Sequence, residues 1–210
     1  MSTVSEYWHS AITDKSYALL TELRRRYRFV LIGGWAVYLH TRALKSKDID
    51  FICDHETLSL LKESFAVVKN ERLKKYEIKA DGFDVDIYVP HWSELGLSAE
   101  EVSRGAVSID GFAVPAIEKL LALKLLAHRQ RKASLKGMKD RIDVVSLFMN
   151  DSFDFSAFNT LSKEHPDLAL EDELAAILDT TFEMPELALN KKKFADFKRR
   201  VRVALGARVS

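Results

Sequence analysis

Three aspartates lie at spacings that suit metal-dependent chemistry. Asp48 and Asp50 flank one apolar residue in the stretch Asp48-Ile49-Asp50-Phe51, and Asp86 lies in a later segment that also alternates polar and apolar residues. In a β-strand, residues two apart point to the same face, so Asp48 and Asp50 present their carboxylates together. Close carboxylates repel each other, and a divalent cation such as Mg²⁺ or Mn²⁺ relieves that repulsion. The spacing therefore predicts a metal site.

The chemistry expected of such a site is an in-line displacement at phosphorus. Two divalent ions about 3.5–4 Å apart activate an attacking hydroxyl and stabilise a leaving pyrophosphate. Asp86 would complete this two-metal clamp from the later strand. Asp84 lies two residues earlier and shares the face of Asp86, so the residues alone leave open which of the two is the third ligand.

A pair of glycines, Gly33 and Gly34, precedes the aspartates and suits the same chemistry. The pair joins an apolar run at 29–32 to a segment typical of a helix at 35–42. Because glycine has no Cβ, a triphosphate could approach the main chain closely and face the N–H groups at the start of the helix. A glycine pair alone equally marks an ordinary tight turn, so this interpretation depends on its place in the ordered set.

The elements that must position these residues alternate between helix and strand as far as residue 114. Apolar periodicity predicts helices at 5–26, 35–42 and 55–65, and strands at 29–32, 48–52, 66–68, 76–79 and 83–89. Asp81-Gly82 and Asp110-Gly111 are hairpin signals, the second of them within a further hairpin at 107–114. In the segment 83–89, alternation places the apolar side chains on the face opposite Asp84 and Asp86.

After Pro115 the pattern becomes helical throughout. Helices are expected at 116–132, 139–149, 155–161, 168–178 and 191–205. The predicted fold class is therefore α+β, a mixed sheet flanked by helices and followed by an all-α C-terminal half. The expected domains are an α/β catalytic domain at 1–114 and a helical domain at 115–210.

The composition excludes several classes of protein. The chain has 210 residues, of which 47% are hydrophobic, so it is too apolar for a disordered chain and long enough for a sizeable core. Its one cysteine rules out an internal disulfide framework. The N-terminus lacks the apolar core of a signal peptide, and the longest apolar run, 29–39, is too short to cross a membrane. We therefore expect a cytoplasmic protein with no membrane partner.

Charge is segregated along the helical half, although the net charge is only +1. Residues 119–141 hold eight Lys or Arg and one acid, residues 164–186 hold eight acids and no Lys or Arg, and residues 191–208 hold eight bases and one acid. The basic stretches either form a groove for a polyanion or lie on solvated helix faces that partly pair with the acidic stretch. The sequence supports both interpretations.

The ordered motifs resemble the DNA polymerase beta-type nucleotidyltransferase superfamily, and look most similar to its minimal and AbiEii-like, toxin-type members. The resemblance is carried by the stretches Val30-Leu31-Ile32-Gly33-Gly34-Trp35-Ala36-Val37, Ser46-Lys47-Asp48-Ile49-Asp50-Phe51 and Asp84-Val85-Asp86-Ile87. It implies a polymerase beta-like nucleotidyltransferase fold. It also implies a metal-dependent transfer of NMP from an NTP, such as ATP, with release of pyrophosphate.

The same resemblance implies roles for individual residues. It assigns Mg²⁺ or Mn²⁺ binding to Asp48, Asp50 and Asp86. Asp86 is preferred to Asp84 because Val85-Asp86-Ile87 matches the family's pattern of an aspartate between apolar residues. Nucleotide contact is assigned to Gly33, Gly34, Ser46 and Lys47.

In the helical half, Lys124 and the stretch Lys139-Asp140-Arg141-Ile142-Asp143 resemble the helix pair that follows the catalytic domain in toxin-type members. By that resemblance Lys124 contacts the nucleotide phosphates, and Asp140 or Asp143 lies near the site or braces the basic residues. The alternative is an ordinary helix pair with surface ion pairs.

The chain also departs from the family at Gly34, where many members have Ser, and at Leu44, where an Arg is frequent. Either departure indicates an altered nucleotide preference or weak activity. Neither of them removes a metal ligand.

The sequence does not identify the acceptor of the nucleotide. RNA such as a tRNA 3′ end, a protein hydroxyl or a small molecule such as an aminoglycoside all fit, and the basic stretches favour an anionic acceptor. An antitoxin or a second copy of the chain is a further expected partner. The alternative function is a non-catalytic or weakly active binding protein of a toxin–antitoxin-like pair, which the presence of all three carboxylates argues against.

Two unrelated enzyme classes also use an Asp-x-Asp motif. A haloacid-dehalogenase-type phosphatase leaves Gly33-Gly34 unexplained and has Thr or Val where this chain has Ile52. A glycosyltransferase predicts a larger domain. Both explain fewer of the residues than a nucleotidyltransferase does.

Overall fold

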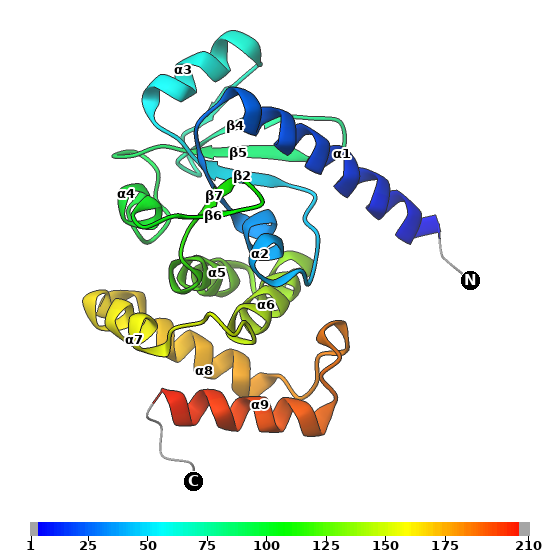
Figure 1. The fold of residues 1–210 in the computed structure, drawn as a ribbon, viewed down its shortest axis with the longest axis vertical. Coiled ribbons are helices and arrows are strands. Elements are labelled where there is room, and N and C mark those ends of the chain that lie inside the picture. Colours follow the sequence, from blue (N-terminus) through cyan, green and yellow to red (C-terminus); the bar gives the residue numbers. More distant parts are fainter. Residues whose placement is uncertain (1–3, 206–210) are drawn as a thin grey trace. The chain divides into compact units, whose positions relative to one another are not determined.

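The computed structural model describes residues 4–205, with side chains described from residue 11 onward. The chain divides into two compact units, Met1–Ala116 and Ile117–Ser210, which follow each other along the colour bar of Figure 1. This division lies two residues beyond the expected boundary between 114 and 115. Residues 1–3 and 206–210, and with them Arg208 of the last basic stretch, lie outside the described residues.

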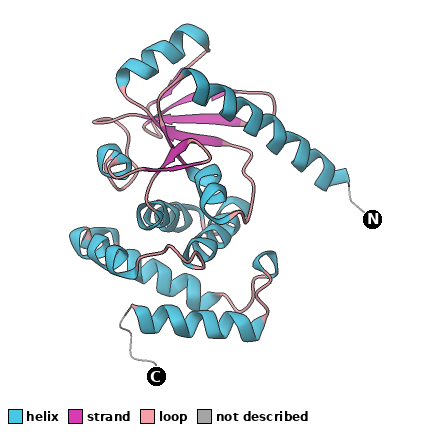
Figure 2. Ribbon diagram, viewed as in Figure 1, coloured by secondary structure: helices cyan, strands magenta, loops and turns pink. Residues whose placement is uncertain are grey.

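Within residues 4–205, the strands of the first unit form a seven-stranded sheet of order β3-β4-β5-β2-β1-β7-β6 (Figure 2). The strands are β1 (Val30–Ile32), β2 (Ile49–Ile52), β3 (Val68–Asn70), β4 (Lys75–Lys79), β5 (Asp84–Tyr88), β6 (Val107–Ile109) and β7 (Phe112–Val114). Strand β2 is parallel to β5 and antiparallel to β1, while β1 is parallel to β7. The expected α+β class with a mixed sheet is confirmed.

Alternation along the central strands separates an apolar face from an acidic one. In β5, Val85 and Ile87 are fully buried, whereas Asp84 and Asp86 are partly exposed. Strand β2 follows the same pattern on either side of the partly exposed Asp50. Since neighbours along a strand point to opposite faces, one face packs into the core and the acidic residues lie on the other, as the sequence predicts.

The helices of the first unit are α1 (Val4–Arg26), α2 (Gly33–Thr41), α3 (His55–Ser64) and α4 (Ala99–Ser103). Helix α2 packs on β1 and β2 and buries Trp35 almost completely. The indole N–H of Trp35 donates a hydrogen bond to Ser16 Oγ of α1 at 2.9 Å, and the ring lies 5.0 Å from that of Tyr17. These contacts hold α2 so that its first residues, Gly33 and Gly34, follow directly on β1.

The described part of the second unit contains helices and 3₁₀ turns. The elements are α5 (Ile117–Arg131), α6 (Leu135–Phe148), α7 (Phe155–Glu164), η1 (Pro166–Leu168), α8 (Leu170–Thr180), η2 (Pro185–Leu187) and α9 (Lys191–Ala204). Helix α5 packs against α6, α7 and α8. The rings of Phe148 and Phe153 lie 4.5 Å apart, and both pack on the buried Phe158. The expected all-α second half is confirmed.

Serine caps explain two helix positions that differ from the expected ones. Helix α6 begins at Leu135 rather than at 139, because Ser134 Oγ accepts a hydrogen bond from the backbone N–H of Gly137 at 3.1 Å. Helix α4 was not expected, and Ser98 starts it by accepting the N–H of Glu101 at 3.1 Å. A serine cap satisfies N–H groups that a helix start leaves unpaired, so both caps are sequence signals that periodicity alone overlooks.

The third strand also differs from the expected one. Strand β3 covers Val68–Asn70 rather than residues 66–68. Its register against β4 pairs Val68 with Glu77 and Asn70 with Lys75. Because β3 is an edge strand, pairing with β4 decides its ends, and a short apolar run does not predict that pairing.

Among the described residues, no helix combines the length and the apolar character needed to cross a membrane. Helix α1 is long enough at 23 residues, but it carries Asp14, Lys15 and Glu22 along its length. This finding does not test the expected cytoplasmic location, which stays a prediction.

Candidate functional site

The sheet brings Asp50 and Asp86 side by side. The parallel register of β2 and β5 pairs Asp50 with Asp86, and the register of β1 and β2 places Ile32 opposite Asp50. Paired residues of neighbouring strands point to the same face, and strands lie about 4.8 Å apart. Two carboxylates at that spacing can reach one ion. The structure therefore brings together Asp50, Asp86 and the turn at Gly33.

Gly33 lies in direct contact with Asp50. Its φ is +67°, and a Cβ added there would lie 2.2 Å from Asp50 Oδ2 and 2.8 Å from Asp50 Cβ. Glycine is therefore required both for the backbone conformation and for the close approach. Helix α2 starts at this point, Ile32 supplies no side-chain cap, and the described first turn holds no acidic residue. Such a helix start favours an anion.

Gly33→Ala is expected to lower both the free energy of unfolding and the affinity of the carboxylates for Mn²⁺. Alanine at this left-handed position costs about 1–2 kcal/mol, and displacement of Asp50 adds to that cost. Gly105→Ala is the matched control, because Gly105 has a φ of +72° and nothing lies within 4 Å of an added Cβ. Urea unfolding and Mn²⁺ titration compare the two variants. Equal losses in both would show that the contact with Asp50 has no influence.

Asp48 lies directly before β2, and Ser46, Lys47 and Asp84 contact it. Its Oδ1 accepts the backbone N–H of Asp84 at 3.3 Å and lies 3.9 Å from Lys47 Nζ. Ser46 is buried, and its hydroxyl donates to the backbone oxygen of Asp48 at 3.2 Å. Ser46 thus braces the loop that carries Asp48, while the half-exposed Lys47 lies beside the carboxylate. Contact of Ser46 or Lys47 with a nucleotide stays a prediction.

Asp84 and Asp86 have different surroundings. The side chain of Asp84 is 42% exposed and its carboxylate forms an ion pair with Lys79 at 3.1 Å. The side chain of Asp86 is only 15% exposed and lies in register with Asp50. Burial raises the pKa of Asp86, and it outweighs the nearby ammonium of Lys75, which lowers that pKa. This placement favours Asp86 over Asp84 as the partner of Asp50.

Lys75 and Glu77 of β4 belong to the same cluster and were not expected there. Lys75 Nζ donates to Asp86 Oδ2 at 2.6 Å and lies 3.0 Å from Glu77 Oε1. Burial lowers the pKa of the Lys75 ammonium, but hydrogen bonds to Asp86 and Glu77 outweigh it, so that pKa is raised. Burial likewise raises the pKa of Glu77, but Lys75 and Asn70 outweigh it, so that pKa is lowered. Lys75 is therefore a firmly held cation.

A sequence signal for this placement does exist. The turn at Asp81-Gly82 pairs Ala80 with Phe83, since the N–H of Ala80 donates to the oxygen of Phe83 at 3.0 Å. Counting outward from that pair places Glu77 opposite Asp86, which is the register observed. The expected hairpin thus contained the position of Glu77, and alternation then places Lys75 on the same face.

The donor set fits a divalent cation. Its ligand atoms are carboxylate oxygens, which Mg²⁺ and Mn²⁺ prefer. Within the described chain, Asp86 Oδ1 is buried and has no hydrogen-bond partner, and buried polar atoms normally have one. An ion bound by Asp86 Oδ1 together with Asp50 would supply that partner. The ammonium of Lys75 on the other oxygen of Asp86 opposes such an ion by its charge.

In the helical unit, Lys124 lies in a buried ion-pair cluster between α5 and α6. Its Nζ lies 2.7 Å from Asp143 Oδ2 and 3.3 Å from Asp140 Oδ1, and both carboxylates are about 1% exposed. Arg131 donates two hydrogen bonds to Asp140, at 2.7 and 3.0 Å. Burial raises the pKa of Asp140, but Arg131 and Lys124 outweigh it, so that pKa is lowered. The carboxylates thus brace basic residues, and a contact of Lys124 with phosphates stays a prediction.

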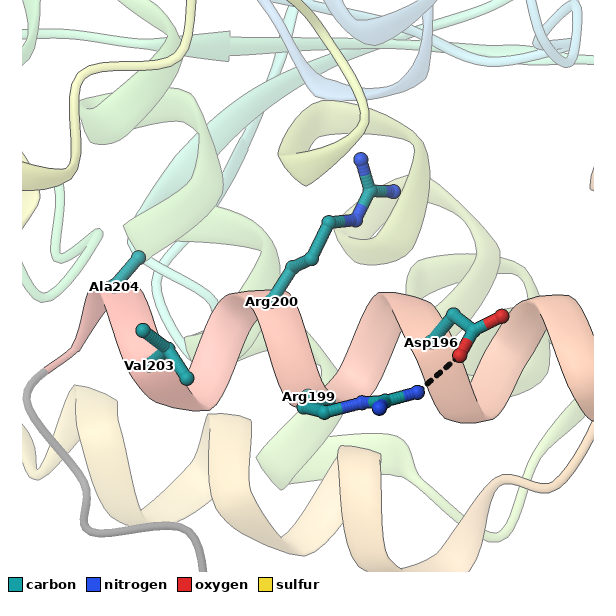
Figure 3. Close-up of a pocket in the computed structure, with 5 residues that line it drawn as sticks. All are labelled: Asp196, Arg199, Arg200, Val203 and Ala204. Atoms are coloured by element: carbon teal, nitrogen blue, oxygen red, sulfur yellow. Dashed lines mark hydrogen bonds and ion pairs between the residues drawn. The ribbon is translucent and has the colours of Figure 1, made fainter.

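Within the described residues of the helical unit, ion pairs of helix α9 run both to the acidic stretch and within α9 itself. Arg202 of α9 contacts Asp179 of α8, and Arg199 contacts Asp196 within α9. A shallow pocket on α9 is lined by Asp196, Arg199, Arg200, Val203 and Ala204 (Figure 3). Figure 3 shows Arg200 pointing away from the ion pair of Arg199 with Asp196. This pocket contains a single carboxylate, so it does not offer the metal chemistry of the sheet.

Several solved structures are similar in fold to this chain. JHP933 from Helicobacter pylori matches with a TM-score of 0.50 and 16% identity over 97% of this chain and 93% of that one. An antigenic nucleotidyltransferase-like protein from Paracoccidioides brasiliensis matches with a TM-score of 0.41 and 20% identity over 76% and 92% of the two chains. The Megavirus polyadenylate synthase matches with a TM-score of 0.42 and 16% identity over 69% of this chain but only 32% of its own.

No protein-family model matches this chain, and no curated protein matches it in sequence. At these identities the likeness to JHP933 is a likeness of fold.

Proposed function

We propose that this chain is a metal-dependent nucleotidyltransferase that moves an NMP from an NTP to a hydroxyl acceptor and releases pyrophosphate. The observation that carries the proposal is the register of Asp50 with Asp86 beside the start of α2 at Gly33. Carboxylates for a cation and a helix start for an anion are the two halves of a metal–triphosphate site. Both are found at one edge of the sheet, where β1 ends and β2 begins.

Asp48, Asp50 and Asp86 are the residues that would hold Mg²⁺ or Mn²⁺. A bound ion supplies charge stabilisation to the triphosphate oxygens and lowers the pKa of an attacking hydroxyl. In the reaction the acceptor oxygen would form a bond to the α-phosphorus as its proton passes to solvent water. The bond from that phosphorus to the bridging oxygen breaks, and pyrophosphate leaves with that oxygen.

The chain's own residues bind and orient the nucleotide in this proposal. The N–H groups at the start of α2, at Gly33 and Gly34, receive the triphosphate, and the absence of a Cβ at Gly33 keeps Asp50 close to it. Lys47, half-exposed beside Asp48, lies where its ammonium can attract a phosphate. Ser46 holds the backbone of this loop in place.

For the acceptor we propose RNA, such as a tRNA 3′ end, before a protein hydroxyl. The support is the base-rich helix α9, in which the residues from Lys191 to Arg202 include seven Lys or Arg and one Asp. Polyanions bind such faces by releasing counterions. An antitoxin or a second copy of the chain stays a proposed partner, and ATP one of the proposed donors.

The alternative is a non-catalytic binding protein with this fold. One observation favours it: Lys75 already neutralises Asp86 without any metal ion. The two functions differ in whether the chain transfers a nucleotide, so one assay distinguishes them.

The assay incubates the protein with each α-labelled NTP, Mg²⁺ or Mn²⁺, and either pooled tRNA or cell lysate. We expect labelled acceptor with the wild type and none with Asp50→Asn. Asp14→Asn is the control, because Asp14 is an exposed aspartate that pairs with the surface residue Lys45. If no acceptor is labelled and NTP binding does not depend on metal, the proposed activity is wrong and the binding protein is favoured.

A further inference from the structure

The feature that the proposed chemistry leaves unexplained is the buried ammonium of Lys75. Its side chain is 12% exposed and lies between Asp86 and Glu77, whose side chains are 15% and 13% exposed. Nζ lies 2.6 Å from Asp86 Oδ2 and 3.0 Å from Glu77 Oε1. Burying a charged group is costly unless it is paired, so the cluster is built around this cation.

Lys79, which lies on the same strand, provides a comparison with an exposed lysine. Lys79 also contacts Glu77, at 3.6 Å, and Asp84, at 3.1 Å, but its side chain is 63% exposed. Solvent and salt screen such a pair. Lys75 lies in the poorly solvated part of the cluster, where charges interact strongly.

The ammonium of Lys75 contacts only one of the two carboxylate oxygens of Asp86, Oδ2, among the contacts of the described chain. Asp86 Oδ1 is buried without a hydrogen-bond partner in the described chain, on the carboxylate that faces Asp50 across the sheet. An ion bound there would lie next to a fixed positive charge. The Coulomb energy between a divalent and a monovalent cation at that separation is large in a site shielded from water.

We propose that Lys75 is a built-in cation that occupies the carboxylates of Asp86 and Glu77 in the metal-free protein and gives up Asp86 when a divalent cation binds. In this proposal Lys75 lowers the affinity of the site for a divalent cation. Without metal it keeps the carboxylates from repelling each other. With metal it retains Glu77 as its partner. This proposal rests on the proposed metal site of Asp48, Asp50 and Asp86.

The test measures metal affinity directly, by Mn²⁺ titration with detection of free Mn²⁺ by electron paramagnetic resonance. We expect K75M to bind Mn²⁺ about tenfold or more tightly than the wild type, because a positive charge next to the ion is removed. K79M is the matched control, and we expect its affinity to change by about twofold at most. D50N should lose binding in both backgrounds.

Thermal unfolding provides a second measurement on the same proteins. A ligand that binds the folded state raises Tm by mass action. We expect K75M to have a lower Tm than the wild type without metal and a larger rise in Tm with Mn²⁺. If K75M fails to fold, K75M/E77M replaces it, because that variant removes one cation and one carboxylate together and leaves the net charge unchanged.

The outcomes separate this inference from the proposed function. Tighter Mn²⁺ binding in K75M with unchanged binding in K79M supports it. Wild-type binding that needs Asp50, together with equal or weaker binding in K75M, overturns the role of Lys75 and leaves the proposed function standing. No Mn²⁺ binding in any variant, with no nucleotide transfer by the wild type, overturns both.

Discussion

Asp86→Ala is expected to abolish nucleotide transfer, on the order of 10²–10³-fold or more, whereas Asp84→Ala is expected only to weaken it. Asp86 lies in register with Asp50 on the neighbouring parallel strand, and its Oδ1 is buried without a partner. The carboxylate of Asp84 is 42% exposed and pairs with the surface residue Lys79. Removing the first takes away a proposed metal ligand, and removing the second takes away an ion pair that solvent screens.

Initial rates of label transfer at saturating NTP and Mn²⁺ measure the difference. Asp86→Ala also removes one of the two carboxylates that contact Lys75 in the described chain, so the fold of this variant is checked by circular dichroism and by its Tm. Asp86→Asn, which keeps the size of the side chain, provides a second variant. The reverse ranking would make Asp84 the third ligand, since its backbone already contacts Asp48.

Asp140→Ala is expected to lower the free energy of unfolding of the helical unit by about 3–5 kcal/mol. Asp140 is about 1% exposed, and it pairs with Arg131 through two hydrogen bonds and with Lys124 at 3.3 Å. In the alanine variant Lys124 and Lys139 would both contact Asp143, and the negative charge of Asp140 would be gone. An excess of buried positive charge is the physical cause of the loss.

Urea unfolding followed by circular dichroism measures this loss. Because the chain has two units, two transitions are fitted if they separate. Asp196→Ala in α9 is the control, since its pair with Arg199 is exposed and is expected to contribute about 0.5 kcal/mol or less. A loss from Asp140→Ala no larger than that of the control would show that the cluster does not stabilise the fold.

The sequence predicts most of the first unit because its strands alternate clearly. The apolar face of Val85 and Ile87 and the acidic face of Asp84 and Asp86 could be assigned from period-two alternation alone. The contact of Asp50 with Gly33 could not, because it depends on the register of β1 against β2. Lys75 was missed because it lies one residue before the expected strand 76–79, and its place beside Asp86 emerges only when the pairing is counted outward from the turn at Asp81-Gly82.

In the helical unit, the helices could be predicted from the sequence, but the buried ion-pair cluster between two of them could not. Apolar periodicity located α5 and α6, but the burial of Lys124, Asp140 and Asp143 between them runs against the usual exposure of charged residues. The stretch 139–143 therefore suited a surface helix equally well. Only the packing of α5 on α6 shows that its charges neutralise one another in the interior.

The hairpin turn at Asp81-Gly82 places a constraint on how this chain can change in evolution or by engineering. Surface loops ordinarily accept insertions at little energetic expense. Here one extra or missing residue would slip β4 by one position against β5, and a slip of one residue turns every side chain of a strand to the opposite face. Lys75 and Glu77 would then leave Asp86 and point into the core. The length of this short loop is thus as much a part of the site as the charged residues themselves.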